Sequence, residues 1–152
     1  MVHPGHGGCT IRQIERREFG GVTSQYFIMT SENDPHTTIM APIDGIDKIG
    51  FRDLISMKEA DEILSCFSAS KSEWNSDSKK RRQDYEATMK GGVLGDIAKM
   101  VNELLVYDKI SALNNFEKEI LPRAQKKLFS EIALVKGIDI DDVTDLVNHM
   151  II

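Results

Sequence analysis

The stretch SMKEADEILSCF, residues 56–67, is where the sequence changes from the period of strands to the period of helices. Ser56 and Glu59 have the spacing of a capping box, in which each side chain accepts a hydrogen bond from the other residue's backbone N–H at a helix start. Apolar residues then recur every three or four positions, as in an amphipathic helix. They are Met57, Ala60, Ile63, Leu64 and Phe67. We therefore predict an α+β fold, with strands before this stretch and helices after it.

The residues before this stretch predict a small antiparallel sheet. Three segments are expected to be strands because they alternate loosely or are rich in aromatic and β-branched residues. Gly20 and Gly21 supply the positive φ angles of a tight hairpin, the cluster SENDP is a turn, and Pro42 is tolerated near a strand end. We expect a strongly bent barrel. Its strands would be TIRQIERREF (10–19), SQYFIMT (24–30) and HTTIMAPI (36–43).

The residues after position 67 predict a helical bundle. SASKSE, residues 68–73, has no periodicity and is expected to be a linker. The next segment, 75–90, is expected to be capped by Asn75 or Ser76 and ended by Gly91-Gly92. Asn114 and Glu117 repeat the capping-box spacing, and Pro122 should kink or restart the helix that follows. The remaining helices are expected over 94–105, from 114 towards Lys136-Gly137, and over 141–150.

Composition and charge limit the classes of function. The chain has 152 residues, a formal charge of −5 and 28% charged residues, which is ordinary for a globular protein and argues against indiscriminate coating of DNA. Residues 1–66 contain 6 basic and 10 acidic residues, and residues 67–152 contain 13 and 14, so any nucleic-acid contact is expected in the second half. Two distant cysteines and the absence of an apolar leader or spanning segment predict a reduced, cytoplasmic protein.

Catalytic and metal sites find little support in the sequence. His3, His6 and Cys9 have an H-x-x-H-x-x-C spacing, but a closed zinc site needs a fourth ligand, and the intervening glycines favour a bend between strands. Cys66 lies beside an apolar helical stripe and is interpreted as core packing. KGGVLGD lacks the Lys-Ser/Thr of a phosphate-binding loop. We expect neither an enzyme nor a bound cofactor.

The only tryptophan, Trp74, precedes the run KKRR, residues 79–82. Most basic runs on helices are solvated, and a single tryptophan is usually a packing residue. Here the tryptophan lies beside a polar linker with little core nearby, and the cations fall within about two helical turns of it. Phosphate contacts could then position the indole against base steps. Composition alone leaves these two interpretations close to even.

The order of several motifs resembles the CarD/CdnL-like bacterial transcription regulators over nearly the whole chain. The first half carries VHPGHG (2–7), IERREFGG (14–21), QYFIMT (25–30), TTIMAPID (37–44) and IGFRDLIS (49–56). The second half carries a tryptophan before a basic helix, KGG (90–92) and EKEILPRAQKKLFSEIALVKGI (117–138). The resemblance implies two domains. Residues 1–67 would be a Tudor-like domain that binds the RNA polymerase β subunit, and residues 68–152 a helical domain that contacts promoter DNA.

The resemblance also implies roles for individual residues. Trp74 matches a tryptophan that wedges into the minor groove at the upstream edge of the transcription bubble and stabilises the open complex. Arg17 matches a polymerase-facing basic position, and the strand around Ile39 and Met40 would lie near that contact by extending a sheet edge. Basic residues would grip phosphates without strong sequence readout. They are Lys79, Lys80, Arg81, Arg82 and Lys118.

The chain departs from the family pattern at several places. The short strand ending in Gly-Asp that usually precedes VHPGHG is not seen, because Met1 lies almost at the motif. Met40 is apolar where some relatives are basic, Pro122 lies within a helix, and the distance from Trp74 to Gly91-Gly92 is about one helical turn longer. The leading interpretation is a monomeric, non-enzymatic regulator of transcription initiation without membrane contact. One alternative is a polymerase-binding adaptor whose helical half recruits another protein instead of DNA. A weaker alternative is a metal sensor that uses His3, His6 and Cys9.

Overall fold

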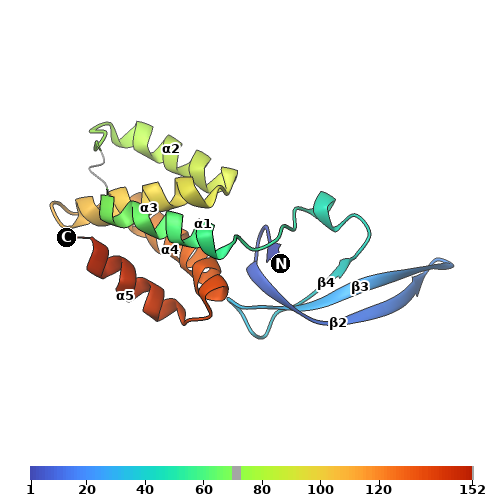
Figure 1. The fold of residues 1–152 in the computed structure, drawn as a ribbon. Coiled ribbons are helices and arrows are strands. Elements are labelled where there is room, and N and C mark those ends of the chain that lie inside the picture. The colour runs from blue at the N-terminus through green and yellow to red at the C-terminus, as the bar shows by residue number, and fades with distance from the viewer. Residues whose placement is uncertain (70–72, 152) are drawn as a thin grey trace. The chain divides into compact units, whose positions relative to one another are not determined.

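The structure, a computed structural model, describes residues 1–69 and 73–151 and divides the chain into two compact units. The first comprises Met1–Ile55 and the second Ser56–Ile152. Figure 1 shows strands in the first unit and helices in the second, which confirms the predicted α+β class.

The first unit is a four-stranded antiparallel sheet in the order β1-β2-β3-β4. Its strands are β1 (Val2–His3), β2 (Gly7–Phe19), β3 (Val22–Ser31) and β4 (Thr38–Pro42), followed by the 3-10 helix η1 (Ile46–Ile49). Gly20 and Gly21 have φ angles of 57° and 79° and join β2 to β3, as the sequence predicts. The long, twisted β2–β3 hairpin is visible in Figure 1.

The sheet is not closed, so the strongly bent barrel that the sequence predicts is present only as an open sheet. In the described residues β1 pairs only with β2, and β4 pairs only with β3. The strands instead curl around a small core on one face, to which Met1, Phe27 and Ile39 also pack. A backbone bridge between Val2 and Arg52 ties the end of the unit to β1. The core residues are Cys9, Met29, Ala41, Ile46 and Phe51.

The second unit is a bundle of helices, in which α3 and α4 share contacts with most of the others. Its helices are α1 (Met57–Ala69), α2 (Ser78–Gly91), α3 (Leu94–Asp108), α4 (Asn115–Lys136) and α5 (Ile140–Met150). Both predicted capping boxes are present, because Ser56 with Glu59 and Asn114 with Glu117 exchange the expected hydrogen bonds. Helix α4 runs through Pro122 without a restart, which is one of the two outcomes that the sequence predicts there.

The domain boundary in the structure differs from the one predicted after Phe67. Helix α1 packs against α3, α4 and α5 of its own unit, because its buried side chains, Ala60, Leu64 and Phe67, complete the core of the bundle. The predicted linker also differs, since residue 68 and the backbone of residue 69 belong to α1. Residues 70–72 of that linker lie outside the described residues.

Candidate nucleic-acid interface and sheet edge

One side-chain cap and the turn before it fix the start of α2. Asp77 is the N-cap, and its carboxylate accepts from the backbone N–H groups of Lys79 and Lys80 at 3.0 and 3.2 Å. The prediction of Asn75 or Ser76 as the cap is therefore wrong. Asn75 accepts instead from the N–H of Asp77 at 2.9 Å, which closes a turn immediately after Trp74. A carboxylate at this position also favours the helix through the partial positive charge of its N-terminus.

Trp74 is half-buried and belongs to a stack of three side chains, which we call the tryptophan stack: Tyr107, Trp74 and Arg81. The ring of Tyr107, on α3, lies parallel to the indole at 3° with a centroid separation of 3.5 Å. The guanidinium of Arg81, on α2, lies 4.2 Å from the indole centroid. The sequence predicts little core near Trp74. The structure instead packs Tyr107 against it, a residue 33 positions later in the chain.

Arg81 is buried, with 9% of its surface exposed, although it belongs to the predicted phosphate-binding run. Its Nε and one terminal nitrogen each lie 2.7 Å from Oε1 of Glu117, and its other terminal nitrogen donates to the carbonyl of Asn75 at 2.8 Å. The second oxygen of Glu117 accepts from the N–H of Asn114 at 3.0 Å as part of the capping box. Arg81 thus forms a buried ion pair with Glu117, and further hydrogen bonds hold both side chains in place. Its role is to stabilise the bundle, whereas its neighbours in the basic run are exposed.

The other predicted phosphate-binding residues lie on the surface. Lys79 and Lys118 are exposed and form no ion pair within the described part of the chain. Lys80 is exposed and lies 2.8 Å from Asp84, and this hydrogen bond raises the pKa of Lys80. Such an exposed pair at i,i+4 contributes little to stability and is readily exchanged for another anion.

Arg82 combines an ion pair with a contact to an aromatic ring. Its Nε lies 3.2 Å from Glu86, and its guanidinium lies 4.7 Å from the ring centroid of Phe116, near the start of α4. The ring limits the rotamers of the arginine while its side chain stays 61% exposed. The structure thus brings the start of α4, where Lys118 lies, close to the basic surface of α2.

A second polar contact that the sequence did not reveal lies beneath α2. Tyr85 is buried and its hydroxyl donates to Glu103 on α3 at 3.2 Å. Burial is the largest cause that raises the pKa of Tyr85, and burial also raises the pKa of Glu103, against the lowering effect of this hydrogen bond. Arg81 and Tyr85 are four residues apart, so they share one helical face, and that spacing is the signal that could have identified Arg81 as inward-facing.

The predicted polymerase-facing residues lie on two different faces of the sheet. The register pairs Arg17 with Ser24, Met40 with Ile28 and Ile39 with Met29. Since alternate residues of a strand face opposite sides, Arg17 and Met40 share the outer face, whereas Ile39 packs towards the core. Arg17 forms an ion pair with Glu15 at 2.8 Å.

Strand β4 forms one border of the described sheet. The N–H of Ile43 donates to the carbonyl of Gln25 on β3 at 3.0 Å. By alternation, the backbone groups of Met40 and Thr38 point away from β3, towards the free edge. This edge therefore offers donors and acceptors to an added strand.

The glycine-rich segment near the N-terminus is a turn built around His3. Nδ1 of His3 accepts from the backbone N–H groups of Gly5 and His6 at 2.9 and 3.0 Å. The thiol of Cys9 donates to the carbonyl of Gly7. Within the residues that the structure describes, no group of three His, Cys, Asp or Glu side chains is placed to hold a metal ion. The geometry therefore favours the bend over the metal-sensor interpretation.

The His3 turn predicts a pH dependence of stability. Burial, with a smaller effect of His6, lowers the pKa of His3 below 6.5, and protonation would remove the acceptor that holds the turn. We expect the sheet unit to lose stability as the pH falls through 6.5, because the unfolded chain then binds more protons. His3→Asn should flatten this dependence, since an amide oxygen accepts the same two bonds without titrating. Unfolding followed against pH tests this, with exposed His36→Asn as the control; equal slopes in both variants would contradict it.

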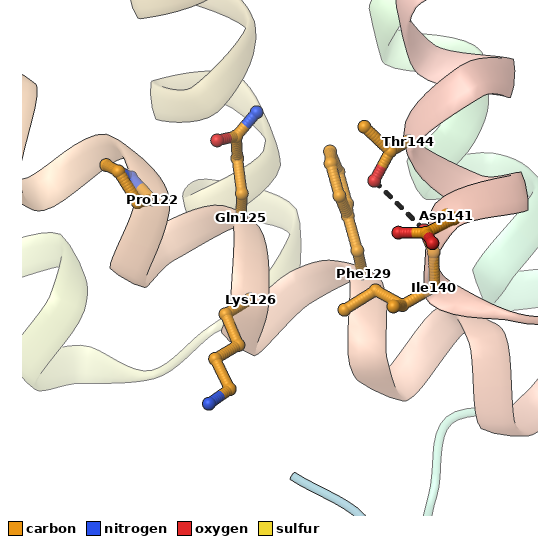
Figure 2. A pocket seen from close by; sticks show the side chains of 7 residues that line it. All are labelled: Pro122, Gln125, Lys126, Phe129, Ile140, Asp141 and Thr144. Carbon is orange, nitrogen blue, oxygen red and sulfur yellow. Dashed lines mark hydrogen bonds between the residues drawn. The ribbon is translucent and has the colours of Figure 1, made fainter.

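Helices α4 and α5 border a shallow groove of about 210 Å³. Figure 2 shows Pro122 and Phe129 on one side and Ile140 and Thr144 on the other, with the hydroxyl of Thr144 bonded within its own helix. Lys126 and Asp141 are the charged residues of its lining. A groove with one residue of each charge lacks a cluster of catalytic groups, so we do not treat it as the functional site.

Comparison with known proteins agrees with the two units. Residues 62–148 match the CarD C-terminal domain, and residues 1–55 match the CarD-like/TRCF RID domain. The chain belongs to the CarD family. A Bacillus subtilis (strain 168) protein named "Putative transcription factor YdeB" is 29% identical to this chain over 138 residues, which cover 91% of this chain and 90% of that protein.

Membership of the CarD family confirms the resemblance seen in the sequence. It makes the chain a transcription-related factor that interacts with RNA polymerase, in a family that is generally non-enzymatic. None of the helices in the described ranges is long and apolar enough to cross a membrane.

Proposed function

We propose that this chain regulates transcription initiation by binding the RNA polymerase β subunit and promoter DNA together, and so stabilises the open complex. The sheet unit would hold β, and the start of α2 would contact DNA at the upstream edge of the bubble. Two weak contacts on one chain reinforce each other, because the first raises the effective concentration of the second. A chain with net charge −5 thus needs only a local cationic surface.

The observation that carries the DNA part is a set of exposed cations on the helix that follows the half-buried Trp74 in the chain. The exposed side chains of Lys79, Lys80 and Arg82 belong to the first turns of α2, which follows Trp74 in the sequence. Such cations bind phosphates in any sequence, whereas an aromatic side chain beside them distinguishes opened from stacked base steps. Lys118 at the start of α4 extends the surface, since Phe116 of that helix contacts Arg82.

The free edge of β4 supports the polymerase part. The outward backbone groups of Thr38 and Met40 would pair with a strand of β, and the side chains of Met40 and Arg17 would meet it from the outer face. Met40 is 44% exposed, which suits it to an apolar contact beside the added strand. Ile39 lies on the opposite face and would contribute indirectly, because its packing on the core fixes the position of β4.

Trp74→Ala should shorten the lifetime of the open promoter complex while β binding stays at the wild-type level. The sheet unit is unchanged in this variant, so a β pull-down serves as the internal control. An unchanged lifetime together with intact β binding would contradict the DNA part and favour the adaptor alternative. A variant that melts far earlier than wild type, yet sustains normal open complexes while folded, would make Trp74 a packing residue only.

Removing the exposed cations should change the salt dependence of DNA binding. In the variant Lys79→Ala, Lys80→Ala, Arg82→Ala, the slope of log K against log salt concentration should become less negative by up to about three units. Each lost phosphate contact contributes about 0.9 to that slope. Sequence preference should stay the same. Binding titrations at several salt concentrations measure this slope.

A charge-matched control separates local contacts from net charge. The variant Lys58→Ala, Lys99→Ala, Arg12→Ala also removes three exposed cations, but none of them lies on α2. Its slope should remain that of wild type. Equal flattening in both triple variants would show that only the total charge matters.

A further inference from the structure

We infer that Tyr107 and Arg81 hold Trp74 with its rim outwards, which makes Tyr107 a positioning residue for the DNA contact. This inference rests on the proposed function and adds the side chains that set how the indole is presented.

Two neighbouring side chains cover the faces of the Trp74 indole. A phenol ring parallel to the indole at a centroid distance of 3.5 Å fills one face at van der Waals contact. The guanidinium carbon of Arg81, 4.2 Å from the indole centroid, then has room only over the opposite face. Both faces of Trp74 are therefore covered by the chain itself. Trp74 nevertheless keeps part of its surface exposed, and with both faces covered that part is the rim.

The second step is electrostatic. An indole face is electronegative, whereas its rim carries the partial positive charge and the N–H donor. The cation of Arg81 lies on one electronegative face, and the rim is the part left for the strongly negative surface of DNA.

The residues that cover Trp74 are themselves held in place. Arg81 is fixed by the carboxylate of Glu117 and by the carbonyl of Asn75, the residue that follows Trp74. Tyr107 lies near the end of α3. The indole is thus held between two helices of one bundle, and inserting its rim into a groove does not require ordering a mobile side chain. Stacking a base on either face would instead require displacing Tyr107 or Arg81.

The test compares Tyr107→Leu with Tyr107→Phe in the full-length chain. Leucine removes the parallel ring, whereas phenylalanine keeps it and loses only the hydroxyl. Since Trp74 is the only tryptophan, its fluorescence reports directly on the stack. We expect Tyr107→Leu to increase quenching by acrylamide and to shorten the open-complex lifetime about two- to tenfold, the range that loss of one aromatic pair implies. Tyr107→Phe should match wild type in both measurements.

Three outcomes would overturn the inference, and they can be told apart. A wild-type lifetime in Tyr107→Leu, with a short lifetime in Trp74→Ala, would refute the positioning role but keep the DNA contact. A longer lifetime in Tyr107→Leu would show that a freed face binds better than the rim. A wild-type lifetime in Trp74→Ala would refute the proposed DNA function and this inference with it. Thermal melting of each variant separates any of these from a loss of folding.

Discussion

Glu117→Ala is expected to destabilise the helical unit by about 3–5 kcal/mol, because it leaves the Arg81 cation buried without its partner. The same carboxylate completes the capping box through the N–H of Asn114, so the substitution also removes a cap of α4. Urea unfolding followed by helical circular dichroism measures the change. A loss below about 1 kcal/mol would contradict the structural role of the pair, since exposed pairs fall in that range.

Two companion variants sharpen this result. Asp84→Ala breaks the exposed pair with Lys80 and should change the stability far less, because solvent screens an exposed ion pair. Replacing both buried partners, as Arg81→Met with Glu117→Leu, should recover most of the stability lost in Glu117→Ala, because apolar side chains of similar volume replace a buried ion pair at little cost. The double variant should still lack the cation over Trp74, so its tryptophan should be quenched more readily.

Phe67→Ala should also cost about 3–5 kcal/mol and should do so in the helical unit, although sequence analysis placed Phe67 in the sheet domain. Phe67 is 3% exposed, and its ring meets that of Phe129 on α4 edge-on, with centroids 6.4 Å apart. For the same reason, residues 56–152 should fold as a separate protein, whereas residues 68–152 should not, because the core side of α1 is then missing.

The control for Phe67→Ala is on the same helix. Met57 is 49% exposed, so Met57→Ala should change stability by no more than about 0.5 kcal/mol. Unfolding monitored separately for sheet and helix signals identifies the affected unit. A variant in which Phe67→Ala destabilised the sheet but left the helices unchanged would restore the predicted boundary.

Local features of this fold could be read from the sequence because short-range chemistry determines them. The two capping boxes depend on side chains three residues apart, and the β2–β3 hairpin depends on Gly20 and Gly21. The C-cap of α2 at Gly92 and that of α4 at Gly137 follow the same rule, since both adopt positive φ. Each of these signals lies within one turn of chain.

The features that sequence analysis missed join residues far apart in the chain. Arg81 reads as one of four cations until Glu117, 36 positions later, is placed beside it. Trp74 likewise lacks an evident packing partner until α3 brings Tyr107 against it. The unit to which α1 belongs and the closure of the sheet both depend on which elements pack together. The apolar stripe of an amphipathic helix does not specify its packing partner.

Strand β4 has a consequence for how the chain behaves at high concentration. A bare sheet edge is open to the same edge of another copy, which is a common start of aggregation. Here the edge is five residues long, and Pro42 leaves it without an N–H at an outward-facing position. Pairing along so short a ladder gives little stability by itself. The strand thus favours a partner that adds side-chain contacts to the backbone pairing.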